Sequence, residues 1–125
     1  MEARRIDHVV VVTPDAEGAA ATFRDHFELP PSPPVVGAPA LAIGDARLAF
    51  VSPAPGTPLA AVLARSGEGM AEVCLEVRSL SEAEAALRKA GIGFTVEAKG
   101  GARALAVDPG AAHGVRLTMV EERAA

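Results

Sequence analysis

Two residues that could act together as a base and its partner, His8 and Glu72, occupy the same position in a repeated stretch of the sequence. The segment His8-Val9-Val10-Val11 matches Glu72-Val73-Cys74-Leu75 at an offset of 64, the step from 8 to 72. A carboxylate beside an imidazole favours the protonated ring and fixes its tautomer, as general-base chemistry requires. The sequence therefore predicts His8 and Glu72 as the catalytic pair.

Each member of this pair also has a purely structural interpretation. His8 can be a hydrogen-bonded histidine of the core, because it lies in a run of β-branched residues. Glu72 can form an ion pair with Arg47 or Arg116 and take no part in chemistry. The sequence leaves both interpretations open.

Strand alternation predicts which other side chains share a face with the pair. Every second side chain of a strand points to the same face of its sheet. The large apolar residues of the later strands, Leu48, Phe50, Leu117 and Met119, must take the core face. The opposite face then carries the candidate pair together with a set of small and polar residues: Arg47, Ala49, Val51, Cys74, Glu76, Arg116, Thr118 and Val120.

The polar members of this face are the predicted ligand-binding residues. Arg47 and Arg116 can clamp a carboxylate or phosphate bidentately, although arginines on edge strands commonly point to solvent. Glu76 also suits a structural role near the end of its strand, and Cys74 suits a small buried apolar side chain. Thr118 completes the set.

Aromatic residues limit the kind of ligand. The chain has no Trp and no Tyr. Phe23, Phe27 and Phe50 are assigned to the core, so Phe94 is the aromatic residue left to meet a ligand. Stacking of a flat aromatic compound between rings is therefore disfavoured.

The elements that must position these residues also occur twice. The first copy has a strand over residues 6–13, a helix after Thr13-Pro14-Asp15 with Thr13 as its cap, a proline-rich loop over 29–34, and strands over 40–43 and 47–52. A further strand near residues 35–36 is weakly marked. A short helix over 59–64 follows in the crossover.

The second copy is marked more clearly. Residues 70–77 form a strand, Ser79 and Glu82 have the spacing of a capping box, and Gly91 ends the helix. Strands over 92–98, 103–108 and 114–121 follow. The match of Ala40–Ile43 with Ala104–Val107 keeps the offset of 64, whereas Arg47 matches Arg116 at an offset of 69, the step from 47 to 116. The second copy has thus gained a loop over residues 108–113.

Composition and charge narrow the class of protein. A chain of 125 residues that is half apolar can form one domain with a continuous core. A net charge of −4 with scattered basic residues argues against nucleic-acid binding. The single cysteine fits a reducing compartment, and no apolar signal or spanning segment follows the first residues. We expect a cytoplasmic, soluble protein with no nucleic-acid or membrane partner.

The sequence resembles the vicinal oxygen chelate superfamily, which includes glyoxalases, bleomycin-resistance proteins and extradiol dioxygenases. The resemblance rests on Ile6-Asp7-His8-Val9, on the ending Asp108-Pro109 followed by His113-Gly114-Val115-Arg116-Leu117, and on the doubled βαβββ order. It implies an α+β fold in which two βαβββ modules curl their sheets into a cup, with helices outside. The modules would span about residues 4–54 and 70–122, joined by a crossover over about 55–69, within a single domain of residues 1–125.

The resemblance also implies four metal positions, which fall on His8, Ala49, Glu72 and Thr118. Only His8 and Glu72 are good ligands, so we expect no resident cofactor and treat a divalent metal ion held by these two as the alternative. The predicted function is binding of a small molecule, by sequestration or with metal-independent chemistry. The alternative is a metal-dependent lyase or isomerase of the lactoylglutathione lyase or methylmalonyl-CoA epimerase type, with Glu76, Cys74 or His113 completing the shell. A homodimer is expected from the same resemblance.

Overall fold

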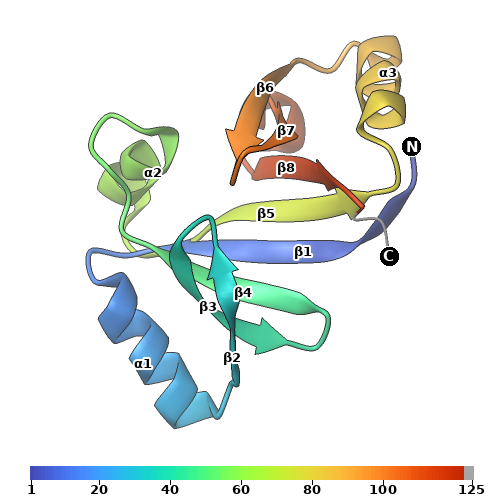
Figure 1. The fold of residues 1–125 in the computed structure, drawn as a ribbon. Helices are drawn as coiled ribbons and strands as arrows, with labels where there is room; N and C mark the ends of the chain where they lie inside the picture. The colour runs from blue at the N-terminus through green and yellow to red at the C-terminus, as the bar shows by residue number, and fades with distance from the viewer. Residues whose placement is uncertain (123–125) are drawn as a thin grey trace. The chain divides into compact units, whose positions relative to one another are not determined.

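The structure is a computed structural model that describes residues 1–122 (Figure 1). Its elements are, in chain order, β1 (Ala3–Val12), α1 (Ala16–Phe27), β2 (Pro31–Val35), β3 (Ala38–Ile43), β4 (Ala46–Val51), α2 (Pro58–Ser66), β5 (Gly69–Val77), α3 (Leu80–Ala90), β6 (Phe94–Lys99), β7 (Ala102–Val107), the short 3-10 helix η1 (Pro109–Ala112) and β8 (Arg116–Glu121). The predicted α+β class is confirmed, and the order of strand, helix and three strands occurs twice.

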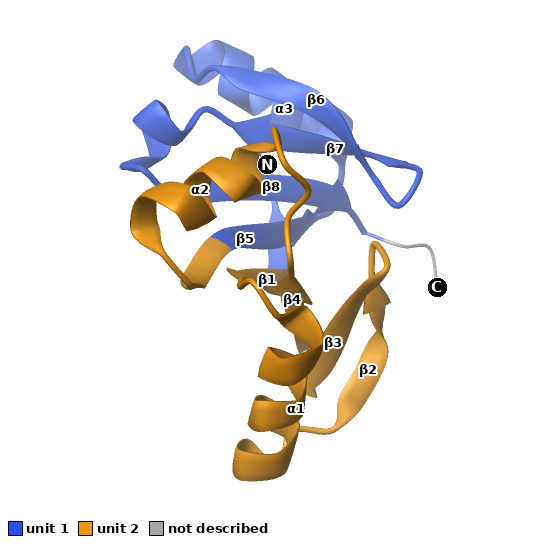
Figure 2. Ribbon diagram, turned by 90° about the vertical axis from the view of Figure 1, so that its left-hand side faces the viewer, with its two compact units in different colours: residues 1–7, 72–125 blue, residues 8–71 orange. Residues whose placement is uncertain are grey.

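The chain divides into two compact units whose boundaries fall inside strands (Figure 2). Unit 1 comprises residues 1–7 and those from 72 onward, and unit 2 comprises residues 8–71. The start of β1 therefore belongs to unit 1, although the rest of that strand belongs to unit 2.

Unit 2 is a sheet in the order β2-β3-β4-β1, covered on one face by α1. β1 runs parallel to β4, with His8 opposite Arg47, and β3 is antiparallel to both of its neighbours. The core against α1 contains Ala20, Leu41, Leu48 and Phe50, with Val9, Val11 and Phe23 packed against it. The predicted alternation is confirmed here, because His8, Val10 and Ala49 occupy the other parity and so the other face.

Unit 1 repeats this layout with the sheet order β5-β8-β7-β6 and α3 on one face. β5 runs parallel to β8, with Glu72 opposite Arg116 and Cys74 opposite Thr118. The core against α3 consists of the buried residues Val77, Leu80, Ala83, Leu87, Leu105, Val107 and Met119. In each unit we call the sheet face turned away from its own helix the far face.

The repeat is preserved in strand register, with one adjustment. His8 opposite Arg47 in unit 2 has the same pairing as Glu72 opposite Arg116 in unit 1. In unit 2, Ala40 pairs with Ala49. The counterpart of Ala49 in unit 1 is Thr118, which pairs with Ala106. The sequence match had indicated Ala104 at this position. The structural match of β3 with β7 is thus displaced by two residues. An even displacement leaves every side chain on its predicted face.

The helix caps illustrate one success and one error of sequence interpretation. Ser79 accepts a hydrogen bond from the backbone nitrogen of Glu82 at 3.2 Å, and Gly91 ends α3 in the left-handed conformation, as predicted. In α1 the predicted cap, Thr13, is wrong. Asp15 accepts from the nitrogen of Gly18 at 3.0 Å, and the Thr13 hydroxyl instead donates to Glu68. The carboxylate of Asp15 can take the capping bond because it lies next to the first helical turn.

Two further expectations for the first copy are wrong. Residues 31–35 form strand β2 despite three prolines, because β2 lies at the edge of its sheet, where a missing N–H is tolerated. Phe27, assigned to the core, is 62% exposed at the end of α1, although its ring centroid lies 5.2 Å from that of Phe23, with the two rings tilted by 56°. Among the described residues, no helix is long and apolar enough to cross a membrane.

Candidate functional site

The far face of unit 1 is built around the carboxylate of Glu72, which is 2% exposed. Arg116 donates from Nε to one carboxylate oxygen at 2.7 Å. The Thr118 hydroxyl donates to the other oxygen at 3.0 Å, and the ammonium of Lys99 lies 2.6 Å from that same oxygen. Both oxygens of a buried acid are therefore engaged, and two of the three partners are cations.

The strand register explains two of these three contacts. Arg116 stands directly opposite Glu72 in the parallel pair of β5 and β8, and Thr118 lies one step of the same face further along β8. Lys99 comes from β6, which is three strand positions from β5 in the sheet. Three strand spacings amount to about 14 Å in a flat sheet, further than a lysine side chain extends. The sheet of unit 1 must therefore curl to bring Lys99 onto Glu72.

The two cations determine the protonation state of Glu72. Burial by itself would raise the pKa of Glu72, but hydrogen bonds and charge attraction from Lys99 and then Arg116 outweigh it and hold that pKa below its usual range. Glu72 is consequently an ionised, weakly basic carboxylate at neutral pH.

Arg116 joins Glu72 to a second carboxylate. Its Nη2 donates to Glu97 at 2.9 Å, and its side chain is only 17% exposed. Burial opposes the charge of Arg116, but the two carboxylates outweigh it and raise the pKa of the guanidinium. Arg116 is therefore a charged group held in one orientation, and the solvent-pointing alternative is wrong for it.

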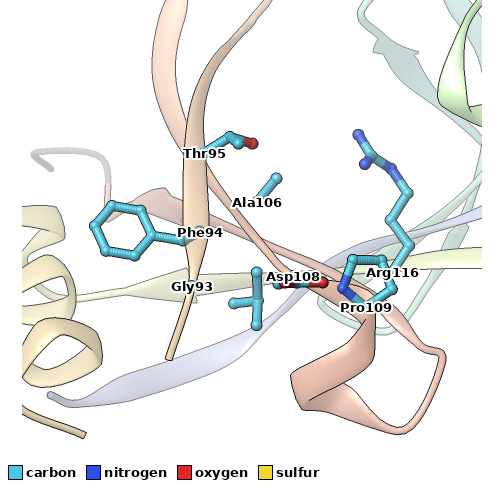
Figure 3. A pocket seen from close by; sticks show the side chains of 8 residues that line it. Gly93, Phe94, Thr95, Ala106, Asp108, Pro109 and Arg116 are labelled. Carbon is cyan, nitrogen blue, oxygen red and sulfur yellow. The ribbon is translucent and has the colours of Figure 1, made fainter. Parts of the chain in front are cut away.

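A pocket of about 350 Å³ adjoins this network within unit 1 (Figure 3). Its lining residues are Gly93, Phe94, Thr95, Ala106, Val107, Asp108, Pro109 and Arg116. Figure 3 shows Arg116 on one side, the Thr95 hydroxyl turned toward it from β6, and the methyl group of Ala106 between them. The pocket thus combines one guanidinium, one hydroxyl and one carboxylate with glycine and apolar residues.

The other predicted residues of unit 1 take up mainly structural positions. The ring of Phe94 turns away from Arg116 in Figure 3, packs with the α3 core and lies 5.4 Å from the guanidinium carbon of Arg88. Glu76 accepts a hydrogen bond from Arg5 at 3.0 Å. Cys74 is fully buried, and burial raises the pKa of its thiol to about 11. Of these three residues, Phe94 lines the pocket, whereas Glu76 and Cys74 do not.

In unit 2 two of the predicted site residues, His8 and Arg47, stand opposite each other in the register of β1 and β4. His8 is 2% exposed, and Ala49, two positions after Arg47, is completely buried. Ala49 packs with Val35 and Ala40 in a small apolar cluster. The far face of unit 2 is therefore apolar around its one histidine and one arginine.

Comparison with solved structures identifies the fold. Methylmalonyl-CoA epimerase from Mycobacterium tuberculosis superposes with a TM-score of 0.85 at 20% identity, over 98% of this chain and 90% of that one. An epimerase variant from Streptomyces coelicolor, in complex with 2-nitronate-propionyl-CoA, gives 0.83 at 20% identity, over 98% and 100%. A hypothetical protein from Bacillus halodurans gives 0.84 at 18% identity, over 97% and 96%.

The chain has the vicinal oxygen chelate fold. The predicted fold is thereby confirmed. At identities of 18 to 20%, these likenesses establish the fold alone. No family model matches the sequence, and no curated protein matches it either.

The vicinal oxygen chelate fold implies a metal, and the residues at its four implied positions do not fit a divalent ion. The side chain of Ala49 has no atom that can bind a metal ion. The hydroxyl of Thr118 donates its hydrogen bond to Glu72. The ammonium of Lys99 lies 2.6 Å from Glu72, where a divalent cation would meet direct charge repulsion. Of the other proposed ligands, Cys74 is a neutral thiol at pH 7, Glu76 is bound by Arg5, and His113 is exposed at the end of η1.

Sequence interpretation missed Lys99 and Glu97, the β6 partners of this network. One signal was present. Thr95, Glu97 and Lys99 alternate with Phe94, Val96 and Ala98, so β6 presents one polar face and one apolar face. The pairing of each charge with its partner was not readable, because it depends on how the sheet curls.

Proposed function

We propose that the protein binds a small organic molecule at the far face of unit 1 and that it does so without a resident divalent metal ion. The observation that carries this proposal is the ammonium of Lys99 at 2.6 Å from the buried Glu72. A cation supplied by the chain itself balances the carboxylate that a metal ion would otherwise need.

The state of Glu72 favours binding over catalysis by this residue. A general base works best with a pKa near the working pH. Lys99 and Arg116 hold the pKa of Glu72 below its usual range, so this carboxylate is a poor proton acceptor at neutral pH. We therefore assign Glu72 the task of orienting Arg116, which lines the pocket. The catalytic role predicted for His8 and Glu72 remains a prediction.

The alternative, a metal-dependent isomerase, is favoured by one observation. Several structural neighbours are methylmalonyl-CoA epimerases, one of them solved with methylmalonyl-CoA. The fold is therefore able to hold a small acyl ligand, which supports ligand binding in either proposal.

Metal analysis separates the two proposals. We expect the purified protein to carry no stoichiometric divalent ion, and Mn²⁺, Co²⁺ or Zn²⁺ to leave its Tm unchanged. The variant Lys99→Met exposes Glu72 to added ions and should gain an ion-dependent rise in Tm. The double variant Lys99→Met/Glu72→Gln is the matched control and should lose that rise.

Two results would contradict metal-independent binding. A stoichiometric ion in the wild-type protein that disappears in both His8→Ala and Glu72→Gln would establish the metal-dependent alternative. A thermal-shift screen of small acids, thioesters and metabolites in the presence of EDTA should give stabilising compounds. A screen with hits only after metal is restored would likewise reject the proposal.

The predicted homodimer remains a prediction. Light scattering across a range of protein concentrations tests it directly, and a constant monomeric mass would count against it.

A further inference from the structure

We propose that the pocket of unit 1 is a site for a small carboxylate, anchored by Arg116 and Thr95. This inference deepens the proposed function and rests on it, because it names the ligand class of the same face. The argument uses only contacts within unit 1.

Arg116 supplies the charge and the geometry. A guanidinium carries five N–H donors in a planar fork, and the bonds to Glu72 and Glu97 account for two of them. Those two bonds come from Nε and Nη2, so the fork is fixed in orientation while part of it borders the pocket. A preorganised fork of this kind suits a carboxylate, which accepts two parallel hydrogen bonds.

The net charge of the residues around Arg116 affects how well the pocket can hold a ligand carboxylate. Lys99 offsets Glu72 at 2.6 Å, which leaves Arg116 with Glu97 as its other partner at 2.9 Å. These four charges sum to zero, so the net negative charge that a ligand carboxylate at Arg116 meets in the pocket is that of Asp108. Without Lys99 the same carboxylate would approach a net negative cluster.

Thr95 adds a second donor on the facing wall. Figure 3 shows its hydroxyl turned toward Arg116, with only the methyl group of Ala106 between the two side chains. A hydroxyl hydrogen is free to rotate toward an acceptor, so Thr95 can donate to a carboxylate oxygen held by Arg116. The small Ala106 leaves the space between the two donors open.

The other end of the pocket suits a hydrogen-bond donor on the ligand. Asp108 lines this end, and one of its oxygens already accepts from the nitrogen of Gly110 at 3.0 Å. A carboxylate offers further acceptor sites beyond one such bond. A hydroxyl group of the ligand, remote from its carboxylate, would find its partner there.

Size limits the ligand to a small metabolite. A cavity of about 350 Å³ is near the lower end of the range for small-molecule sites, about 300 to 1,000 Å³. We therefore place the ligand among monocarboxylates of about four to eight carbons.

The test is a binding titration in EDTA with hexanoate and 6-hydroxyhexanoate as probes and hexanamide as their uncharged match. We expect both carboxylates to bind, the hydroxy acid more tightly, and the amide to bind at least about tenfold more weakly, because it loses a charge-assisted hydrogen bond. Calorimetry gives the Kd values, and saturation-transfer NMR locates the contact on the ligand.

Two variants examine the anchor. Thr95→Val keeps the shape of an exposed side chain and removes its hydroxyl, so hexanoate affinity should fall about tenfold. Val96→Ala changes the neighbouring residue on the opposite face of β6 and is the matched control, with no expected change. Ala106→Leu fills the space between Arg116 and Thr95 and should abolish binding, with circular dichroism confirming the fold.

Each other result decides against this inference. Equal affinity for hexanoate and hexanamide, unchanged affinity in Thr95→Val, or no carboxylate binding at millimolar concentration would overturn it. If other compounds of the screen still bind in EDTA, the proposed function survives and only the ligand class is wrong. If carboxylates bind only with an added divalent ion, the proposed function itself fails.

Discussion

The far faces of the two units have the same layout and opposite chemistry. In unit 2 the register places His8 opposite Arg47 and Val10 opposite Ala49, and in unit 1 it places Glu72 opposite Arg116 and Cys74 opposite Thr118. The outer strand differs as well: β2 is rich in proline, whereas β6 contributes Glu97 and Lys99. A duplicated unit has thus kept its backbone pairing, while the residues on its far face have diverged and those of unit 1 form a buried network of charge around Glu72.

This contrast shows what a repeat constrains. Strand register and core parity are set by backbone hydrogen bonds and by the large apolar side chains, which match in both copies. The side chains of the far face do not have to pack against the helix of their own unit. The far face can therefore be apolar in one unit and charged in the other.

The largest expected effect comes from removing the equivalent arginine of each unit. Arg116→Met leaves the buried Glu72 and its neighbour Glu97 short of a cation, and we expect it to lower the free energy of unfolding by about 3 kcal/mol. Arg47→Met is the matched comparison, and we expect it to cost less because Arg116 bridges two carboxylates, Glu72 and Glu97, whereas Arg47 stands opposite His8 in the strand register. Urea denaturation of both variants at pH 7 measures the difference. Equal losses would show that the two faces are alike in energy.

Acid sensitivity sharpens the same contrast. The pKa of Glu72 is lowered in the folded protein, so its ion pairs contribute stability above the ordinary carboxyl value of 4.5. That contribution disappears as the pH falls below 4.5 toward the folded pKa, when the carboxylate takes up a proton.

We expect Glu72→Gln to reduce this acid-dependent loss, since an amide does not titrate in this range. Urea denaturation between pH 7 and pH 3 compares the two proteins. Lys99→Arg keeps the positive charge and should preserve the slope of the wild-type protein. Identical slopes for wild type and Glu72→Gln would mean that Glu72 is not a source of the acid sensitivity.

The smallest expected effects come from the helix caps, where the two units are alike. Ser79→Ala in unit 1 and Asp15→Ala in unit 2 each remove one capping hydrogen bond. Each should lower the free energy of unfolding by about 1 kcal/mol. Thr13→Val tests the correction directly, because Thr13 does not cap α1. Its effect should come through the lost bonds to Glu68 and to the backbone nitrogen of Asp15, and should leave the helix content, measured by circular dichroism, unchanged.

Sequence interpretation was most successful where one local rule acts alone. Ser79 and Gly91 were assigned correctly because a cap requires only its own turn. The strand expected near residues 35–36 was placed too late, because the prolines of β2 indicate a loop unless the strand is known to lie at a sheet edge, which is a property of the whole sheet. Phe27 was wrongly assigned to the core. Helical spacing predicts the face of α1 on which Phe27 lies, but it does not show whether the sheet extends far enough to cover this last residue of the helix.

The candidate site was predicted only in part for a similar reason. Alternation placed Glu72, Arg116 and Thr118 on one face, and both Arg116 and Thr118 donate hydrogen bonds to Glu72. Phe94 was assigned to a ligand because the other three phenylalanines were placed in the core; it lines the pocket, and it also packs against the α3 core. Lys99 was overlooked because no spacing in the sequence relates it to Glu72.

The sequence by itself determined the doubled order of elements, the face on which each strand residue lies and the scarcity of metal donors at positions 49 and 118. These follow from chain periodicity and from the chemical nature of single residues. Only the tertiary structure decided that Glu72 is held by Lys99 as well as Arg116. That contact spans three strand spacings, about 14 Å in a flat sheet, and it forms only because the sheet of unit 1 curls.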